Sequence, residues 1–226
     1  MADEGLIPYQ PTRVSISDSK DRADDFYSLM NARRSVRHFS DEPVPKELIE
    51  LAIRTASTAP SGAHRQPWQF VAVSDAKIKL QIKDAAEKEE REFYESGKTP
   101  HEWLNAVRPM GTNAEKPYLT IAPWIVVLFE QVHRLDESNN VEKNYYVKES
   151  VGIACGLFIA ALQNMGLATL THTPSPMSFL SKLLDRPQNE RPFVLFPIGY
   201  PATDARVPNL TRKSLDQVST LSLIHI

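Results

Sequence analysis

The stretch "TASTAPSGAHRQPWQFVAV" (residues 55–73) spans the end of one predicted element, a loop and the next element. Before the loop, "PKELIELAIRTAST" (45–58) has apolar residues at helical spacing, and Pro45 suits the first turn of a helix. After the loop "PSGAHRQP" (60–67), the segment "WQFVAVSD" (68–75) is rich in residues that favour strands. The stretch therefore predicts a helix, a loop and a strand in succession.

The rest of the chain continues this alternation of helices and strands. We expect an extended N-terminal arm over 1–20, a polar loop over 137–144, one domain over 21–220 and a tail of no assigned function over 221–226. The other expected elements are helices at 21–33, 76–96 (after an Asp75 cap), 145–166 and 179–185, and strands at 124–131, 167–173 and 191–201. This order predicts an α/β or α+β fold.

Composition excludes several classes of protein. Of the 226 residues 42% are hydrophobic, and the net charge is −2, so a large core is possible and a nucleic-acid or membrane-surface footprint is not indicated. The single cysteine, Cys155, permits no internal disulfide and is typical of a reducing compartment. No secretory signal or membrane span is evident, and the six histidines lack metal-ligand spacing. We therefore expect a soluble, cytoplasmic protein without a metal site.

A cluster of basic residues lies in "NARRSVRHFS" (31–40). Arg33, Arg34, Ser35 and Arg37 could form a solvated basic face, or they could bind a phosphate. Guanidinium groups match phosphate oxygens two at a time, and a serine hydroxyl adds one more hydrogen bond. The common glycine-rich nucleotide motifs are missing from the sequence. Both interpretations stay open from the residues alone.

Two loops carry further candidate residues. The Pro-Ser-Gly-Ala turn at 60–63 reads either as a plain connection or as free backbone N–H groups that a flat ring can approach closely. In "LTHTPSP" (170–176), Thr173 lies at the end of a predicted strand just before Pro174. Its hydroxyl either belongs to a turn or points out of the sheet.

Five motifs in order give the chain a family resemblance. "RRSVRHF", "TASTAPSGAHRQPWQFVAV", "GLATLTHTP", "PIGYP" and "RKSLDQ" together resemble the FMN-dependent nitroreductase superfamily over residues 28–217, and within it the iodotyrosine deiodinase family. The resemblance implies an α+β nitroreductase fold with a central mixed or antiparallel sheet flanked by helices. It also implies an intertwined homodimer with two active sites at the interface.

The resemblance implies that FMN is the cofactor and assigns residues to it. The basic cluster would hold the phosphate and ribityl chain, the Pro-Ser-Gly turn would reach the flavin from the partner subunit, and Thr173 would donate to flavin N5. The implied FMN-binding residues are Arg33, Arg34, Ser35, Arg37, Pro60, Ser61, Gly62, Thr171, His172, Thr173 and Arg212.

A substrate clamp is implied in a lid segment at about 88–118. Glu90 and Tyr94 are four residues apart and share one helical face, and Lys116 follows later. Each of these residues alone would be an ordinary solvated side chain. In deiodinases such a trio grips the amino-acid end of halotyrosine, and the backbone N–H of Ala63 would hold its phenolate oxygen.

The implied function is FMN-dependent reductive dehalogenation of halotyrosine through one-electron flavin steps, with Thr173 as the catalytic residue. Three alternatives stay open: a general NAD(P)H-dependent FMN nitroreductase or quinone reductase, a flavin-fragmenting enzyme, and a non-catalytic FMN-binding protein. The sequence does not identify the electron donor, which is either NAD(P)H or an unknown reductase.

Overall fold

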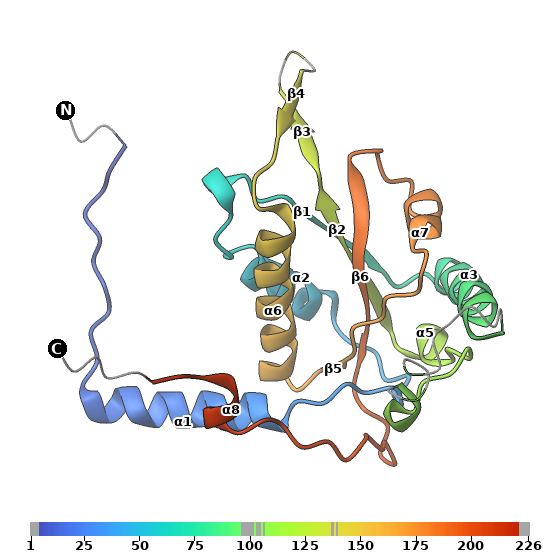
Figure 1. Ribbon diagram of the computed structural model, residues 1–226, viewed down its shortest axis with the longest axis horizontal. Coiled ribbons are helices and arrows are strands. Elements are labelled where there is room, and N and C mark those ends of the chain that lie inside the picture. The colour runs from blue at the N-terminus through green and yellow to red at the C-terminus, as the bar shows by residue number, and fades with distance from the viewer. Residues whose placement is uncertain are drawn as a thin grey trace.

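The centre of the protein is a four-stranded sheet. The structure is a computed structural model that describes residues 5–95, 102, 105, 107–136, 138 and 140–221. The strands pair antiparallel, and Ser35 adds a parallel bridge to Thr169 at the edge, so the sheet is mixed there. The strand order is β1 (Trp68–Val73), β2 (Trp124–Gln131), β6 (Glu190–Gly199) and β5 (Ala168–Thr169), as Figure 1 shows.

Helices cover both faces of this sheet (Figure 1). Because β2 is buried on both faces, its sequence is a continuous apolar run rather than an alternating one. Val126 and Leu128 pack in one core cluster, and Val127 and Phe129 pack in the other. The first cluster contains residues of α2 (Lys46–Ala56) and α6 (Val147–Asn164), and the second contains residues of α3 (Ala76–Glu95), α5 (Tyr118–Ile121) and α7 (Ser178–Leu183).

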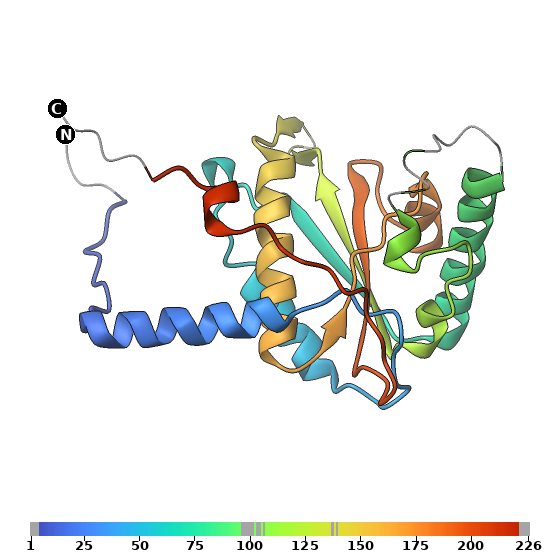
Figure 2. The ribbon, with the colours of Figure 1, turned by 60° about the horizontal axis from the view of Figure 1, so that its bottom comes forward.

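The first helix, α1 (Ile16–Ala32), extends away from the sheet (Figure 2) and has no buried residue. It begins five residues before the predicted start at Asp21, so the prediction of an extended arm to residue 20 was wrong at its end. The reason is an N-cap: the Ser15 hydroxyl accepts a hydrogen bond from the Asp18 N–H at 3.0 Å. Of the arm, residues 1–4 lie outside the described part of the chain.

One predicted loop is a hairpin. Val141–Lys143, expected to be part of a polar loop, forms β4 and pairs with β3 (His133–Leu135). The turn is held by Asp136, which accepts hydrogen bonds from the Ser138 and Asn140 N–H groups at 2.8 Å. Short polar strands give no periodic hydrophobic signal, so the sequence pattern could not show this pair.

The strand predicted over 167–173 was wrong in length, because only β5, Ala168–Thr169, forms and His172 adds an isolated bridge to Leu195, so Thr173 does not end a strand. The other boundaries differ only slightly from expectation. Asp75 caps α3 as predicted and accepts from the Lys77 and Ile78 N–H groups at 2.9 Å. Pro45 is the N-cap of α2 rather than its first helical residue. Within the described residues, no helix is both long and apolar enough to cross a membrane. The remaining short elements are η1 (Gly62–His64), η2 (Arg108–Met110) and α8 (Leu215–Val218).

Candidate functional site

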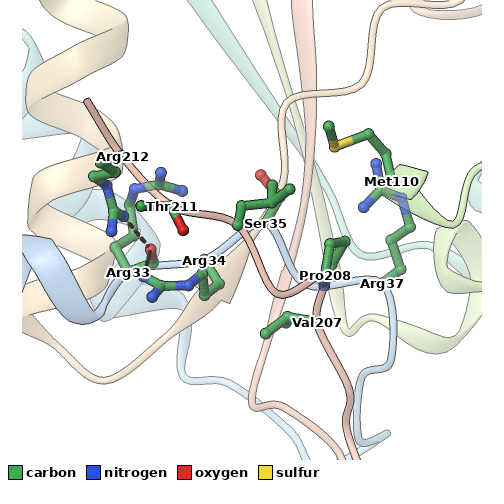
Figure 3. Close-up of a pocket in the computed structure, with 10 residues that line it drawn as sticks. Arg33, Arg34, Ser35, Arg37, Met110, Val207, Pro208, Thr211 and Arg212 are labelled. Atoms are coloured by element: carbon green, nitrogen blue, oxygen red, sulfur yellow. Dashed lines mark hydrogen bonds between the residues drawn. The ribbon is translucent and has the colours of Figure 1, made fainter. Parts of the chain in front are cut away.

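A cavity lined by arginines lies just after the end of α1, around Ser35, which bridges to the edge of the sheet (Figure 3). No carboxylate is among the residues that line it, so its positive charge is not neutralised there. Burial, and then the nearby Arg212 and Arg34 guanidinium groups, lower the pKa of Arg33. Its lining residues are Arg33, Arg34, Ser35, Arg37, Met110, Val207, Pro208, Leu210, Thr211 and Arg212. Such a cavity favours an anion.

Hydrogen bonds to the end of α1 assemble this arginine cavity. Arg212 donates to the backbone carbonyls of Asn31 and Arg33, both at 2.9 Å, although it lies 179 residues beyond Arg33. Arg34 donates to the Asn31 carbonyl at 2.7 Å. The guanidinium groups thus satisfy carbonyls at a helix C-terminus and are held close together against their mutual repulsion. A merely solvated basic face would not require this arrangement.

A second cavity adjoins the first through Arg37, which lines both. The Arg37 Nε is buried and has no hydrogen-bond partner among the described residues, so the site offers a donor that a ligand can satisfy. The second cavity is lined by Arg37, Glu90, Tyr94, Val107, Thr112, Tyr118, Leu170, Thr171, His172, Thr173 and Ser175.

The structure brings the three predicted clamp residues together. The Lys116 Nζ lies 3.0 Å from a Glu90 oxygen, and the Tyr94 phenol shares a hydrogen bond with Thr112 beside them. The Lys116 side chain is only 1% exposed. Burial lowers the pKa of Lys116, and the Glu90 carboxylate opposes this shift. Of the lid segment, residues 96–101, 103, 104 and 106 lie outside the described chain.

Glu87 is a residue that the sequence analysis missed. Its carboxylate accepts the Lys116 backbone N–H at 2.7 Å and pairs with Lys83 at 2.9 Å. It therefore joins the segment that carries Lys116 to α3. The available signal was its spacing of four residues from both Lys83 and Arg91 on the predicted helix.

The side chains of residues 171–173 are alternately exposed and buried. Thr171 and Thr173 are exposed, whereas His172 between them is buried and packs edge-on against the Tyr118 ring with centroids 5.9 Å apart. Burial lowers the pKa of His172 to about 3, with smaller contributions from Lys116 and Arg37. The backbone of His172 bridges to Leu195 of β6, so the two threonine side chains are held on the side away from the core.

The Pro60–Ala63 turn lines neither of these two cavities. It runs into η1, in which Ala63 and His64 have φ of 49° and 53°, and Gln66 just after η1 has φ of 48°. This left-handed backbone is unfavourable for side-chain-bearing residues. Gly62 is required sterically, because a Cβ there would lie 2.7 Å from the Tyr145 carbonyl oxygen. In a single chain the predicted flavin-binding residues are thus split between two places.

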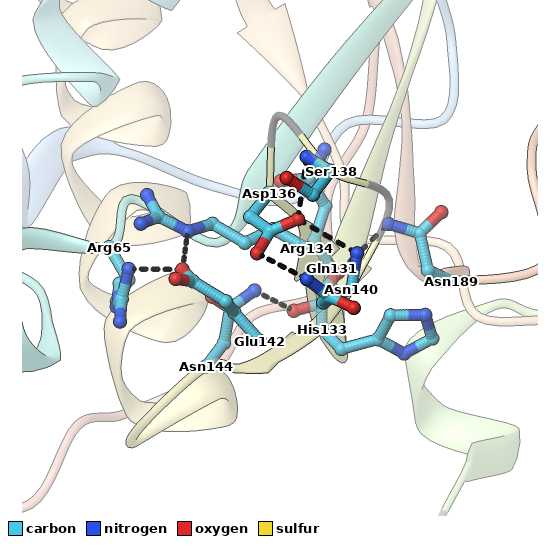
Figure 4. Close-up of polar contacts among 10 residues, drawn as sticks. All are labelled: Arg65, Gln131, His133, Arg134, Asp136, Ser138, Asn140, Glu142, Asn144 and Asn189. Carbon is cyan, nitrogen blue, oxygen red and sulfur yellow. Dashed lines mark hydrogen bonds and ion pairs between the residues drawn. The ribbon is translucent and has the colours of Figure 1, made fainter.

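An ion-pair network supports this turn from the β3–β4 hairpin (Figure 4). Glu142 accepts from Arg65 at 2.8 Å and from Arg134 at 2.6 Å. On the turn itself, the Ser61 hydroxyl accepts the Gln66 N–H at 2.9 Å. These contacts hold a conformation that the backbone would not favour by itself.

Comparison with known proteins gives the family. The model of the nitroreductase family matches residues 30–200. A relative from Haliscomenobacter hydrossis, an iodotyrosine deiodinase, is 52% identical over 208 residues, which are 92% of this chain and 93% of that protein. The chain belongs to the nitroreductase family and, within it, to the iodotyrosine deiodinase family. A second deiodinase relative, iodotyrosine deiodinase 1 of Homo sapiens, is 44% identical over 94% of this chain and 73% of its own length.

A solved structure supports the fold of this deiodinase-family chain. Oxidized iodotyrosine deiodinase bound to FMN and 3-iodo-L-tyrosine is similar with a TM-score of 0.73 and 31% identity, over 87% of this chain and all of that one. The α+β nitroreductase fold expected from the sequence is therefore confirmed. The deiodinase-family resemblance inferred from five short motifs is confirmed as well.

Proposed function

We propose that this chain is an FMN-dependent enzyme that reductively removes iodide from iodotyrosine. The net reaction adds two electrons and one proton, breaks the carbon–iodine bond and gives tyrosine and iodide. One observation carries the proposal beyond family membership: Glu90, Tyr94 and Lys116 gather next to an arginine-lined cavity. A carboxylate, a phenol and an ammonium suit the zwitterion of an amino acid, and a general nitroreductase has no need of them.

The arginine cavity fits the phosphate of FMN. Four arginines and Ser35 line a space whose lining residues include no carboxylate, and the Nε of one of them, Arg37, is a buried donor without a partner among the described residues. Arg33, Arg34 and Arg212 would hold the phosphate, and Ser35 and Arg37 would lie toward the rest of the cofactor. When bound, FMN supplies the two electrons, one at a time.

Specific roles for the other residues belong to the same proposal. Thr173 is exposed, and its hydroxyl would donate to flavin N5, with Thr171 and His172 beside it. Glu90 pairs with the ammonium of the substrate, Lys116 with its carboxylate, and Tyr94 hydrogen-bonds to the same group. The backbone N–H of Ala63, on the Pro60–Ala63 turn that lines neither cavity, holds the phenolate oxygen in the site of a second subunit.

A second copy of the chain completes the site in this proposal. The turn with Pro60, Ser61 and Gly62 lines neither of the two cavities described, so it reaches a flavin only in another subunit. Apolar side chains are exposed on the α1 and α6 surfaces, such as Phe26 at 57% and Ile153 at 46%, and a partner would cover them. We therefore propose a homodimer, located in the cytoplasm and reduced by NAD(P)H or a separate reductase.

Anaerobic turnover tests this function. The holoenzyme is reduced with dithionite and mixed with 3-iodotyrosine, and free iodide and tyrosine are quantified together with flavin reoxidation. We expect one iodide and one tyrosine per reduced flavin. Reoxidation by nitroaromatics alone would instead favour a general nitroreductase, and no reoxidation by either compound would favour a non-catalytic flavin-binding protein.

A further inference from the structure

A third cavity, with a volume of about 310 Å³, opens beside the arginine cavity. It shares several lining residues with the arginine cavity, Ser35 and Arg37 among them. Arg37 also lines the second cavity, so this residue borders all three. The residues that line the third cavity are Ser35, Arg37, His38, Pro109, Met110, Gly111, Arg206, Val207 and Pro208. The third cavity is thus next to the place where the substrate is proposed to react.

The residues assigned to the two ends of FMN do not line the third cavity. The three arginines proposed to bind the phosphate, and Thr173, proposed to contact flavin N5, are all absent from its lining. Figure 3 shows those three arginines on the opposite side of Ser35 from Arg37. The third cavity therefore branches off at Ser35 and Arg37 and offers space for a ligand other than the cofactor.

The lining of the third cavity combines basic and apolar groups. Arg37, His38 and Arg206 supply two guanidinium groups and an imidazole, and no carboxylate is among the described residues that line it. The other side chains are mainly apolar, and the Met110 thioether is soft and polarisable. A guanidinium is more weakly hydrated than an ammonium. These groups suit a large, weakly hydrated anion better than a phosphate, which requires many hydrogen-bond donors.

Hydrogen bonds between two remote segments hold the basic residues of this cavity in place. The Ala202 N–H donates to the His38 carbonyl at 3.0 Å, and the Arg206 N–H donates to His38 Nδ1 at 3.4 Å. Because Nδ1 accepts, a neutral His38 carries its proton on Nε2, which is then a donor. His38 and Arg206 are both exposed, so an anion in the third cavity can exchange with solvent.

Iodide is the product of the proposed reaction that fits this description. It is large, polarisable and weakly hydrated, and it forms in the second cavity, which Arg37 also lines. A positive potential attracts an anion as soon as its charge develops. We propose that the third cavity binds the product iodide, through Arg37, His38 and Arg206, as it leaves the substrate site. This inference rests on the proposed function, which supplies the iodide.

Binding of anions to the oxidised holoenzyme tests the site without turnover. Sodium iodide, thiocyanate, chloride and sulfate are titrated by calorimetry at constant ionic strength, because salt screens exposed charges. We expect iodide and thiocyanate, both weakly hydrated, to bind as a single anion per subunit, chloride to bind more weakly and sulfate not to bind. Sulfate binding as tight as that of iodide would overturn the proposal, since it would indicate an unselective basic surface.

Arg206 lines neither of the first two cavities, so its variants isolate the third. Arg206→Gln should weaken iodide binding about fivefold, the size expected for one exposed charge pair, and should keep its FMN. Arg206→Lys keeps the charge on a strongly hydrated ammonium, so it should bind chloride like wild type but lose most of the preference for iodide. Equal iodide affinity in Arg206→Gln and wild type would overturn the proposal.

The matched control is Arg191→Gln. It removes an exposed guanidinium at the start of β6, outside the three cavities, and should change the affinity for none of the four anions. A loss of iodide affinity as large as that in Arg206→Gln would show a general effect of net charge and would contradict a specific site. Flavin content and circular dichroism show whether each variant is folded, and the wild-type titrations decide the matter if a variant is not.

Product inhibition connects the third cavity to turnover. Deiodination is followed through tyrosine, so added iodide does not disturb the measurement. Because the clamp residues do not line the third cavity, we expect iodide to inhibit even at saturating iodotyrosine, and to do so about fivefold less strongly in Arg206→Gln. Inhibition that saturating iodotyrosine abolishes would place the iodide in the second cavity and overturn the proposal.

The inference and the proposed function fail in distinguishable ways. Deiodination of iodotyrosine by a protein that binds no iodide in the calorimeter would leave the proposed function in place and overturn the exit site. A reduced holoenzyme that releases no iodide from iodotyrosine would overturn the proposed function and the product role of the cavity together. In that case the calorimetry still shows whether the third cavity binds weakly hydrated anions.

Discussion

The Arg65 guanidinium lies 2.8 Å from the Glu142 carboxylate and thereby joins the turn after α2 to the β3–β4 hairpin, 77 residues away along the chain. The turn contains three side-chain-bearing residues with positive φ. Such a backbone persists only where its surroundings hold it. The same carboxylate also accepts from Arg134 at 2.6 Å, so one acidic residue connects two basic ones.

We therefore expect Glu142→Gln to loosen residues 61–66. Hydrogen exchange of these amides should speed up, and the affinity for FMN should fall, while the exchange of the β2 and β6 amides stays unchanged. Arg134, and then Arg65, hold the pKa of Glu142 below its ordinary value. The contribution to stability is thus present at neutral pH and lost as the pH falls below about 4. A constant difference in melting temperature between wild type and variant at all pH values would contradict this.

Removing one arginine of the cavity should release the cofactor. We expect Arg33→Ala to weaken FMN binding by about 2–5 kcal/mol, as for other buried charge contacts that lose one partner. The measurement is fluorescence titration of the apoprotein with FMN. The control is Lys88→Ala, which removes an exposed positive charge from α3 and should leave the affinity unchanged. Wild-type protein that holds no FMN below micromolar concentrations would refute the proposed function as a whole.

The Thr173 hydroxyl should be needed for deiodination but not for the reduction of nitroaromatics. We expect Thr173→Ala to keep its FMN and to lose about one to two decades in iodide release, the value of one positioned hydrogen bond of roughly 1–3 kcal/mol. Reduction of nitroaromatics, a two-electron process, should persist. Thr173→Ser keeps the hydroxyl and should restore deiodination. Iodide release at the wild-type rate by the alanine variant would make Thr173 a turn residue only.

The exposed residues of α6, which include Gly152, Ile153 and Gly156, offer a test of the proposed homodimer. Gly156 is exposed and has no atom within 4 Å of the place where a Cβ would lie, so a side chain has room to begin there within one chain, and Gly156→Leu improves helix propensity. In the proposed homodimer a bulky side chain there should obstruct the partner. We expect light scattering to show a monomer. The circular dichroism spectrum should be unchanged, and the affinity for FMN should be lower. The control Lys88→Leu adds the same side chain on α3 and should remain dimeric.

Burial of His172 predicts a specific acid sensitivity. Its folded pKa of about 3 lies below the ordinary value of 6.5, so the unfolded chain takes up a proton that the folded chain refuses. Stability is therefore full above pH 6.5 and falls toward pH 3 by about 1.4 kcal/mol per pH unit. His172→Thr should flatten this slope in denaturant titrations, and His64→Asn, which replaces an exposed ring, should not. Equal slopes in all three proteins would contradict the buried neutral imidazole.

The long periodic elements of the fold could be predicted from sequence. The β2 strand has the expected bounds, 124–131, because a short apolar run between two turns is typical of a buried strand. The β3–β4 hairpin could not be predicted, since its strands have three residues each and one of the partners of Glu142, Arg65, comes from a distant segment. Pattern analysis detects periodicity and not ion pairs between remote parts of a chain.

The candidate site divides in the same way. Glu90 and Tyr94 follow from helical spacing, but their meeting with Lys116 depends on the path of the intervening segment, which no local pattern encodes. Glu87 escaped notice because the bond it makes is to the backbone of Lys116 rather than to its side chain. The family resemblance supplied what spacing alone could not.

Arg212 meets the end of α1 across 179 residues of intervening chain. During synthesis on the ribosome, Arg33 and Arg34 emerge early and Arg212 emerges late. The nascent chain therefore cannot present the complete arginine cavity until almost all of the sheet and its helices have been translated. Under the proposed function, in which this cavity holds the FMN phosphate, loading of the cofactor is a late event in the maturation of this protein. A chain interrupted before residue 212 would lack part of the anion site even if its core had folded.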